Sequence, residues 1–194
     1  GKAFCAGQDL AEAIDPSIPS ISKIIQEHYN PIIRKIRNIE KPIVAAVNGV
    51  AAGAGASIAL ACDIIVATES ASFVQAFSKI GLIPDSGATF FLPRLVGMQK
   101  ATALMMSGEP ILAKDAETMG MIYKTYSDEK FELESWNLVS KLSKMPTKGL
   151  GLTKKLLNAS INNDLEDQLI MEDKCQVTAA NTADFKEGVQ AFLE

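Results

Sequence analysis

A run of small residues directly after a buried strand constrains the fold of this chain more than any other feature. Pro42–Val47 is a continuous apolar run rich in β-branched residues, typical of a parallel strand covered on both faces. Asn48-Gly49 turns the chain, and Ala52–Ala56 contains only alanine and glycine. Such small side chains let a helix begin very close to a neighbouring strand. The pattern predicts an α/β fold with a strand-to-helix junction at this point.

The small residues admit two interpretations. A helix that begins there has unpaired N–H groups at its first turn, which could bind an anionic group. No phosphate-binding glycine motif, neither G-x-x-x-x-G-K-[ST] nor G-x-G-x-x-G, occurs at this position. Tight packing of the helix on the sheet explains the same residues equally well, so both interpretations remain open.

A second informative stretch, Phe73–Arg94, contains the isolated carboxylate of Asp85. Pro84 precedes it and Gly87 follows it, and its neighbours in the sequence are mostly apolar. An apolar environment favours the protonated form of a carboxyl group and brings its pKa toward the range of a general acid or base. The alternative is that Asp85 caps a helix that begins near Ser86 or Gly87.

The chain begins within a strand-like run, Ala3–Ala6, without a methionine. We therefore expect further N-terminal elements of the fold to be missing from this sequence. Gly7 can turn the backbone so that the next N–H groups point into a cavity, and Asp9 can cap a short helix over Leu10–Ile14.

A loop is expected at residues 15–20, followed by a helical stripe from Ile21 that Pro31 should kink or split. Strands are expected at residues 63–68 and 71–75, and residues 120–126 form the only clear strand of the second half. Helices are predicted over residues 88–95, 99–106, 113–119, 130–143, 147–160, 164–180 and 182–193. This order predicts an α/β core over residues 1–128 and a helical region over residues 129–194.

Composition excludes several classes of protein. The 194 residues are 47% hydrophobic and have a net charge of −4 with interspersed signs, which argues against a nucleic-acid partner. No apolar run is long enough to span a membrane, so we expect a cytoplasmic protein with no membrane partner. The three cysteines lack metal-ligand spacing, and His28 has no nearby metal partner, so we predict neither a disulfide framework nor a metal site.

Taken together, these stretches resemble the crotonase (enoyl-CoA hydratase/isomerase) superfamily. The matching segments run in the family's order: Phe4-Cys-Ala-Gly-Gln-Asp-Leu10, Ala45–Ala56, Ala61-Cys-Asp-Ile64, Gly81-Leu-Ile-Pro84 and Phe185–Phe192. The resemblance implies a spiral of ββα units, an acyl-CoA thioester as substrate, and no cofactor beyond the coenzyme A of that substrate. It also implies a homotrimer or a dimer of trimers, built on the C-terminal helices.

Carried over by position, the resemblance assigns an oxyanion hole to the backbone N–H groups of Gln8 and Ala54. Two fixed donors at a thioester carbonyl would stabilise an enolate that forms only during the reaction. Positions that line the substrate pocket in relatives correspond here to Ala6, Asp9, Leu10, Val50, Ala52, Gly53, Ala76 and Ile80.

The departures from the family pattern bear on the activity. Where family hydratases have two glutamates, this chain has Ser57 and Phe77. Neither can act as a base at neutral pH, and we expect Phe77 to form a wall of the acyl pocket. Asp85, in contrast, matches the catalytic aspartate of several isomerases of the family.

The resemblance is closest to the family's group of ring-epoxide phenylacetyl-CoA isomerases of phenylacetate degradation. We therefore expect an acyl-CoA isomerase that moves a double bond, or isomerises a ring epoxide, with Asp85 as the proton shuttle. Two alternatives remain open: a hydratase with an unconventional partner for Asp85, and a non-catalytic subunit that binds CoA esters.

Overall fold

The computed structural model describes residues 1–13 and 20–194. It comprises two units, residues 1–37 with 43–137 and residues 38–42 with 138–194. The boundary predicted at residues 128/129 precedes α8 (Phe131–Ser143), whereas the chain divides within this helix. Ile14 and most of the loop predicted at 15–20 lie outside the described residues.

The first unit contains every strand of the described chain. The strands are β1 (Ala3–Cys5), β2 (Val44–Val47), β3 (Val50–Ala52), β4 (Ile64–Thr68), β5 (Ser72–Val74), β6 (Pro110–Leu112) and β7 (Lys124–Tyr126). The helices before α8 are α1 (Leu10–Ala13), α2 (Ile21–Ile24), the π-helix η1 (Ile25–Tyr29), α3 (Asn30–Asn38), α4 (Ala54–Ala61), the 3₁₀ helix η2 (Ala76–Ile80), α5 (Ala88–Val96), α6 (Met98–Ser107) and α7 (Ala113–Thr118).

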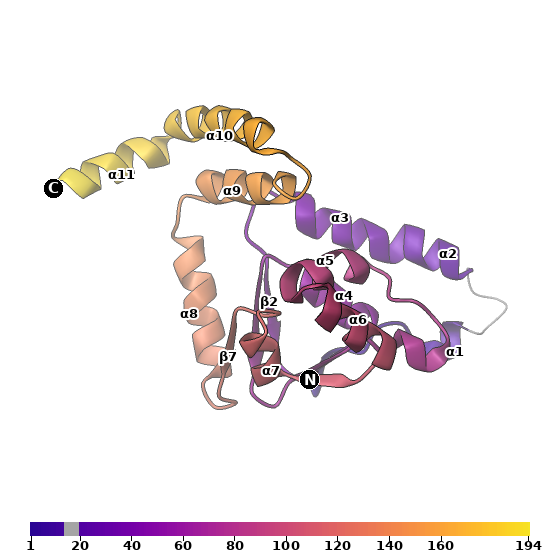
Figure 1. Cartoon of the computed structure of the whole chain (residues 1–194). Helices are drawn as coiled ribbons and strands as arrows, with labels where there is room; N and C mark the ends of the chain where they lie inside the picture. The colour runs from indigo at the N-terminus through magenta and orange to yellow at the C-terminus, as the bar shows by residue number, and fades with distance from the viewer. Residues whose placement is uncertain (14–19) are drawn as a thin grey trace. The chain divides into compact units, whose positions relative to one another are not determined.

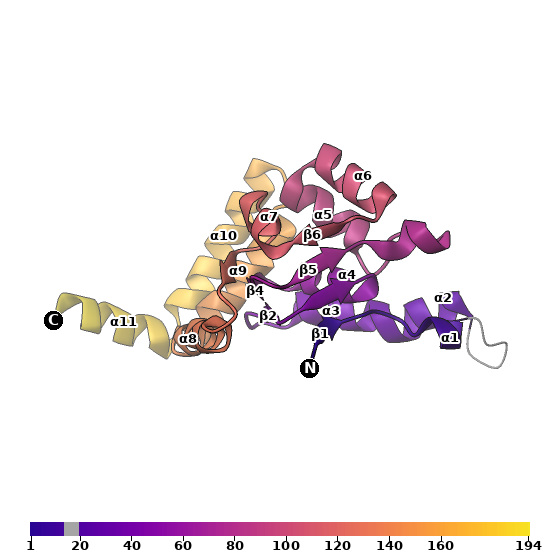
Figure 2. The same ribbon diagram turned by 90° about the horizontal axis from the view of Figure 1, so that it is seen from below.

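The strands form two sheets. One has the order β1-β3-β5-β6, with β6 antiparallel to β5 and the other pairs parallel; the second, β2-β4-β7, is parallel throughout. From β2 to β5, successive strands alternate between the sheets, and α4 follows β3 and packs against β1 and β3 (Figure 2). This repeat of two strands and a helix confirms the predicted ββα spiral.

The core of this unit is built from both sheets and the helices around them. Its largest fully buried apolar side chains are Phe73 of β5, Leu92 of α5, Met121, and Val47 of β2. The strand predicted at residues 42–47 is therefore confirmed as a buried element, and its register with β4 pairs Val44 with Ile64. Arg37 joins α3 to this layer, because its guanidinium donates to Asp63 at 3.1 Å.

The sequence analysis missed two short strands. Val50–Ala52 is the strand β3, for which no strand was predicted, and β6 adds a second strand to the half of the chain where only one was expected. The helical stripe from Ile21 comprises α2, the π-helix η1 and α3 in direct succession (Figure 1). The regular α-helix is therefore interrupted directly before Pro31, which lies in the first turn of α3. A proline is tolerated in a first turn because its missing N–H needs no acceptor there.

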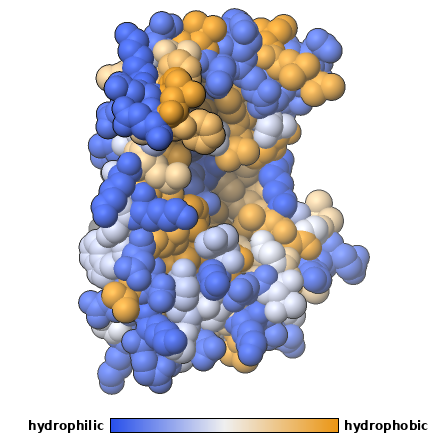
Figure 3. Space-filling view, turned by 90° about the vertical axis from the view of Figure 1, so that its left-hand side faces the viewer, coloured by the Kyte–Doolittle hydropathy of each residue, from blue (hydrophilic) through white to orange (hydrophobic). Residues whose placement is uncertain are grey.

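The second unit is helical, as predicted. It contains the end of α8, α9 (Thr147–Ala159), α10 (Leu165–Ala180) and α11 (Ala183–Leu193). The Lys154 ammonium of α9 is buried and donates to the carbonyl of Lys41 at 3.1 Å, which ties residues 38–42 to this unit. Large apolar residues of α10 and α11 remain exposed, and Figure 3 shows hydrophobic residues at the surface on the side where the C-terminus lies.

Of the helices in residues 1–13 and 20–194, none is both long and apolar enough to cross a membrane.

Candidate functional site

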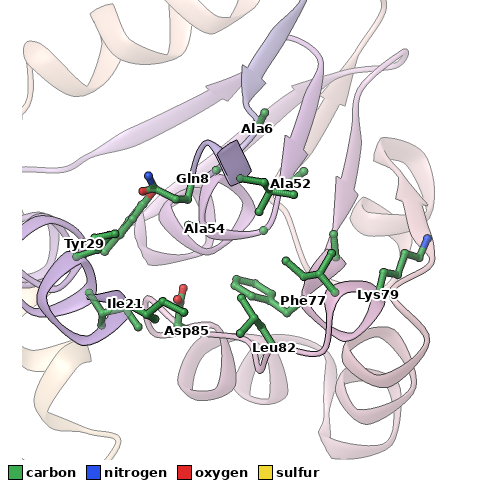
Figure 4. Close-up of a pocket in the computed structure, with 17 residues that line it drawn as sticks. Ala6, Gln8, Ile21, Tyr29, Ala52, Ala54, Phe77, Lys79, Leu82 and Asp85 are labelled. Atoms are coloured by element: carbon green, nitrogen blue, oxygen red, sulfur yellow. The ribbon is translucent and has the colours of Figure 1, made fainter. Parts of the chain in front are cut away.

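A largely apolar cavity of about 220 Å³ lies in the first unit (Figure 4). Its walls come from the β1–α1 connection, α2 with η1, the β3–α4 junction, η2, and the segment that leads to α5. The predicted site residues that line it are Ala6, Gln8, Leu10, Ala52, Gly53, Ala54, Ala76, Phe77, Ile80 and Asp85. The fold thus brings together residues that are far apart in the sequence.

Three of the predicted site residues do not line this cavity. Asp9 is exposed, and its carboxylate accepts from the Ala11 N–H at 2.9 Å, in line with the predicted capping role. Val50 is 42% exposed within β3. Ser57 is fully buried in α4, where its hydroxyl donates to the Gly53 carbonyl at 3.2 Å. We therefore assign these three residues no contact with a ligand in the cavity.

Two main-chain segments approach each other closely at the cavity wall. Gly7 has φ +86°, and a Cβ at this position would lie 3.1 Å from the Ala52 carbonyl oxygen and 3.3 Å from the Ala54 nitrogen. Ala54 is the first residue of α4, so its N–H has no acceptor within the helix. The Gly53 N–H, in contrast, donates to Val74 at 2.9 Å.

The Gln8 N–H lies on the other segment. It has no acceptor within hydrogen-bonding distance among residues 1–13 and 20–194. The two amides predicted to form the oxyanion hole therefore belong to Gln8 and Ala54, which line the same cavity. The role of the pair in catalysis stays a prediction.

Asp85 supplies the carboxylate of the site. It is half-buried, and Figure 4 shows its side chain directed into the cavity near Ile21 and Phe77. Burial raises the pKa of Asp85, and the hydrogen bond from the Ser86 hydroxyl, at 2.9 Å, opposes this effect. A raised pKa suits a group that must both accept and return a proton near neutral pH.

Asp85 does not cap the following helix. The N-cap of α5 is Gly87, and no side chain there bonds to the first turn. Ser86 has φ +52° and Gly87 has φ +81°, so two consecutive left-handed residues turn the chain between Asp85 and the helix. A left-handed conformation costs about 1 kcal/mol at a residue other than glycine, such as Ser86. The turn at Ser86 and Gly87 places Asp85 outside the first turn of α5.

Phe77 forms an apolar wall, as predicted. Its side chain is 8% exposed, and a Cβ at Gly53 would lie 3.9 Å from the tip of its ring. The aromatic ring therefore occupies the space beside the β3–α4 junction. No carboxylate can approach the cavity from this position.

Several residues of the cavity were not predicted from the sequence. They are Gly7, Ile21, Ile24, Ile25, Tyr29, Lys79 and Leu82. Ile21, Ile25 and Tyr29 are spaced by four residues, which indicates a common helix face. This spacing could have identified the wall in advance, but it could not show which sheet residues the helix faces.

Tyr29 is the polar member of that wall. Its hydroxyl donates to Gln8 Oε1 at 3.1 Å. Burial is the main cause that raises the pKa of Tyr29, and the nearby charges of Cys5, Asp85 and Glu12 add to it. The phenol therefore stays protonated, and a hydrogen-bond donor, at neutral pH.

Comparison with known proteins agrees with this arrangement. The sequence matches the enoyl-CoA hydratase/isomerase family over residues 1–194. It is 44% identical over 196 residues to the 1,2-epoxyphenylacetyl-CoA isomerase of Escherichia coli K12, covering all of this chain and 75% of that protein. It is 34% identical over 197 residues to the trans-2-decenoyl-[acyl-carrier-protein] isomerase of Streptococcus mutans, again covering all of this chain and 75% of that protein.

Solved structures show the same similarity. The crystal structure of an enoyl-CoA hydratase from Polaromonas sp. JS666 superposes with a TM-score of 0.93 at 35% identity, covering the whole of this chain and 76% of that one. The sequence match extends over the complete chain, and the fold is the one that the family shares. The chain belongs to the enoyl-CoA hydratase/isomerase, or crotonase, family.

Proposed function

We propose that the protein is an acyl-CoA isomerase in which Asp85 is the only acid–base group that acts on the acyl chain. The observation that supports this most directly is that the half-buried carboxylate of Asp85 lines the same cavity as Gln8 and Ala54. Burial raises the pKa of this carboxyl group. Family resemblance implies that hydratases use two glutamates to activate water. The corresponding residues here are Ser57, which is buried and bonded to Gly53, and the apolar Phe77.

The proposed reaction needs one base and one pair of donors. The thioester carbonyl oxygen accepts from the N–H groups of Gln8 and Ala54. Asp85 removes a proton from C2 of a 3-enoyl thioester or from C4 of a 2-enoyl thioester, and the electron pair moves into a dienolate whose charge the two amides stabilise. The same carboxyl group returns the proton at the other end, so no water or cofactor is consumed. Preorganised donors of this kind typically contribute about 3–4 kcal/mol each to transition-state stabilisation.

The apolar surroundings favour proton transfer over addition of water. Phe77, Leu82 and the isoleucines of α2 and η1 leave Asp85 few polar neighbours in the cavity. Exclusion of water strengthens the electrostatic interactions of a developing enolate and protects it from side reactions. The identity of the acyl group is a finer proposal: similarity to the E. coli isomerase supports a phenylacetyl-CoA ring epoxide, alongside straight-chain enoyl-CoA thioesters.

A product assay tests the proposal. The protein is incubated separately with a 3-enoyl-CoA and a 2-enoyl-CoA in water enriched in ¹⁸O, and the products are analysed by mass spectrometry. We expect each substrate to equilibrate with the other at unchanged mass. Accumulation of a 3-hydroxyacyl-CoA containing ¹⁸O as the main product would identify a hydratase instead. Binding without any turnover across enoyl and ring-epoxide substrates would favour a non-catalytic CoA-ester-binding subunit.

We also propose that α10 and α11 form contacts between copies of this chain in a trimer or a dimer of trimers. Leu165 and Val177 of α10 are 70% and 55% exposed, and Phe192 of α11 is 91% exposed. Exposed apolar side chains of this size commonly mark interaction surfaces. Light scattering coupled to size-exclusion chromatography should give the mass of three or six chains, and a monomer would contradict the proposal.

A further inference from the structure

We infer that Tyr29 is a positioning residue of this site, which acts through the side chain of Gln8 on the Gln8 backbone amide. The inference deepens the proposed function and depends on it for the catalytic role of that amide. Its physical basis, however, is a separate set of contacts that does not involve Asp85 as a base. Nothing in the local sequence around Tyr29 indicates this role, because its partner lies 21 positions away.

The Gln8 side chain is held at both ends. Its Oε1 atom accepts from the Tyr29 hydroxyl at 3.1 Å, and its Nε2 atom donates to Glu12 Oε2 at 3.0 Å. Figure 4 shows the Gln8 side chain reaching toward the Tyr29 ring along one side of the cavity. An amide whose oxygen and nitrogen are both bonded has a fixed orientation, so the residue that bears it loses much of its rotational freedom.

Gln8 needs such external support because its backbone lies outside regular structure. β1 ends at Cys5 and α1 begins at Leu10, so neither a sheet nor a helix fixes the peptide between Gly7 and Gln8. Gly7, with φ +86°, is a residue type of high conformational freedom. The Ala54 amide is different, since α4 directly determines its direction. Of the two donors, only the one at Gln8 depends on side-chain contacts for its direction.

The electrostatics of Tyr29 suit a permanent donor. Burial and the neighbouring charges of Cys5, Asp85 and Glu12 all raise the pKa of the phenol, so it does not ionise in the pH range of the reaction. The hydroxyl proton is directed to Gln8, and the ring contributes apolar surface to the cavity wall. Tyr29 therefore supports the donor without taking part in proton transfer.

The first test replaces the hydroxyl alone. Tyr29→Phe keeps the ring and removes the bond to Gln8. Loss of one such hydrogen bond should lower kcat about five- to tenfold, with KM changed less than twofold. Tyr123→Phe is the matched control: Tyr123 is 64% exposed and does not line the cavity, so its kcat should equal that of the wild type.

A second readout reports on the donor directly. A saturated acyl-CoA with a ¹³C-labelled thioester carbonyl binds without reacting, and hydrogen bonding lowers its carbonyl stretching frequency in the infrared. We expect the frequency of the bound ester to lie closer to its value in solution for Tyr29→Phe than for the wild type. A purely structural role would not change this frequency. The same substitution at Tyr123 should leave it unchanged.

A double-mutant cycle completes the test. Gln8→Leu removes the side-chain amide but keeps the backbone N–H, so its effect on kcat should be similar to that of Tyr29→Phe. Because both changes break one link, the double variant should be no slower than the slower single variant. Multiplied losses in the double variant, or a wild-type carbonyl frequency in Tyr29→Phe, would overturn the inference. If the wild type isomerises no substrate, the proposed function fails, yet the carbonyl measurement still tests the support of the amide.

Discussion

Replacement of Asp85 by asparagine should affect activity and stability in opposite directions. Asparagine has the shape of aspartate, and its Oδ1 atom can still accept from the Ser86 hydroxyl, which lies 2.9 Å from Asp85 Oδ1. It cannot take up and return a proton. A positioned acid–base group contributes about 10²–10⁴-fold to a rate, which corresponds to about 2.7–5.4 kcal/mol. We expect kcat to fall by this factor while binding of a saturated acyl-CoA changes little.

The effect on stability follows from the raised pKa of Asp85. Burial shifts the pKa above the value of about 4 for an exposed aspartate, so the folded state binds this proton more tightly than the unfolded chain does. The resulting stabilisation is present below pH of about 4 and is lost as the pH rises through the folded-state pKa. At pH 7 the wild type therefore contains a partly desolvated carboxylate. Asparagine avoids this, so the variant should unfold at the same or a higher urea concentration.

Asp128 offers a control of opposite sign. Its carboxylate accepts from the Thr68 hydroxyl and the Ser70 N–H, and these bonds hold its pKa below the ordinary value. The stabilisation by Asp128 is present at neutral pH and is lost as the pH falls through its lowered pKa. Asp128→Asn should therefore unfold at a lower urea concentration at pH 7, with kcat unchanged.

The measurements are kcat for conversion of a 3-enoyl-CoA to the conjugated 2-enoyl-CoA, followed by ultraviolet absorbance, and urea unfolding at pH 7. A wild-type kcat in Asp85→Asn would remove Asp85 from the proton-transfer role. A loss of more than about 1 kcal/mol of unfolding free energy would show that the ionised carboxylate is favourably solvated, against the argument from burial.

Two further predictions concern the packing of the helices and the dryness of the cavity. In α9, the nearest atom to a Cβ at Gly149 is the Pro146 Cβ, at 3.9 Å, among the described residues, whereas a Cβ at Gly151 would lie 2.6 Å from the Glu40 carbonyl oxygen. Gly149→Ala should raise the unfolding free energy by about 0.5–1 kcal/mol. Gly151→Ala should lower the unfolding free energy by about 1–3 kcal/mol, because the new methyl group has no space. Equal effects of the two substitutions in urea titrations would contradict the packing described. Phe77→Ala should admit water and lower the pKa of the catalytic carboxyl, so the acid limb of the kcat/KM profile moves to lower pH. An unmoved limb would show that Phe77 does not desolvate that group.

The sequence predicts the long elements of this fold well, because their periodicity and composition are local properties. Helices such as α9 and α10 begin and end within a residue or so of the predicted bounds. The strands β3 and β6 have only three residues each, too few for a periodic pattern, and β6 begins with a proline. These two strands form because β5 offers pairing partners on both sides, which is a property of the folded chain.

The residues of the candidate site also differ in whether the local sequence identifies them. Asp85 stands out in the sequence because it is a lone acid in an apolar, turn-rich segment. Tyr29 does not stand out, since its relevance depends on Gln8, which reaches it only after β1 and η1 have been brought together. The predicted pocket residues Val50 and Ser57 show the converse: their positions match the family pattern, yet strand pairing and a bond to Gly53 direct them elsewhere.

The small-residue run Ala52–Ala56 shows why packing and ligand binding were hard to separate from the sequence. A Cβ at Gly55 would lie 2.7 Å from the carbonyl carbon of Cys5, so glycine is required for α4 to pack on β1. The same close approach brings the Ala54 N–H, unpaired at the start of α4, beside the Gly7–Gln8 segment. The two interpretations are therefore compatible with each other. The packing contact is what places both amides on one cavity wall, so a larger residue at position 55 should disturb stability and carbonyl binding together.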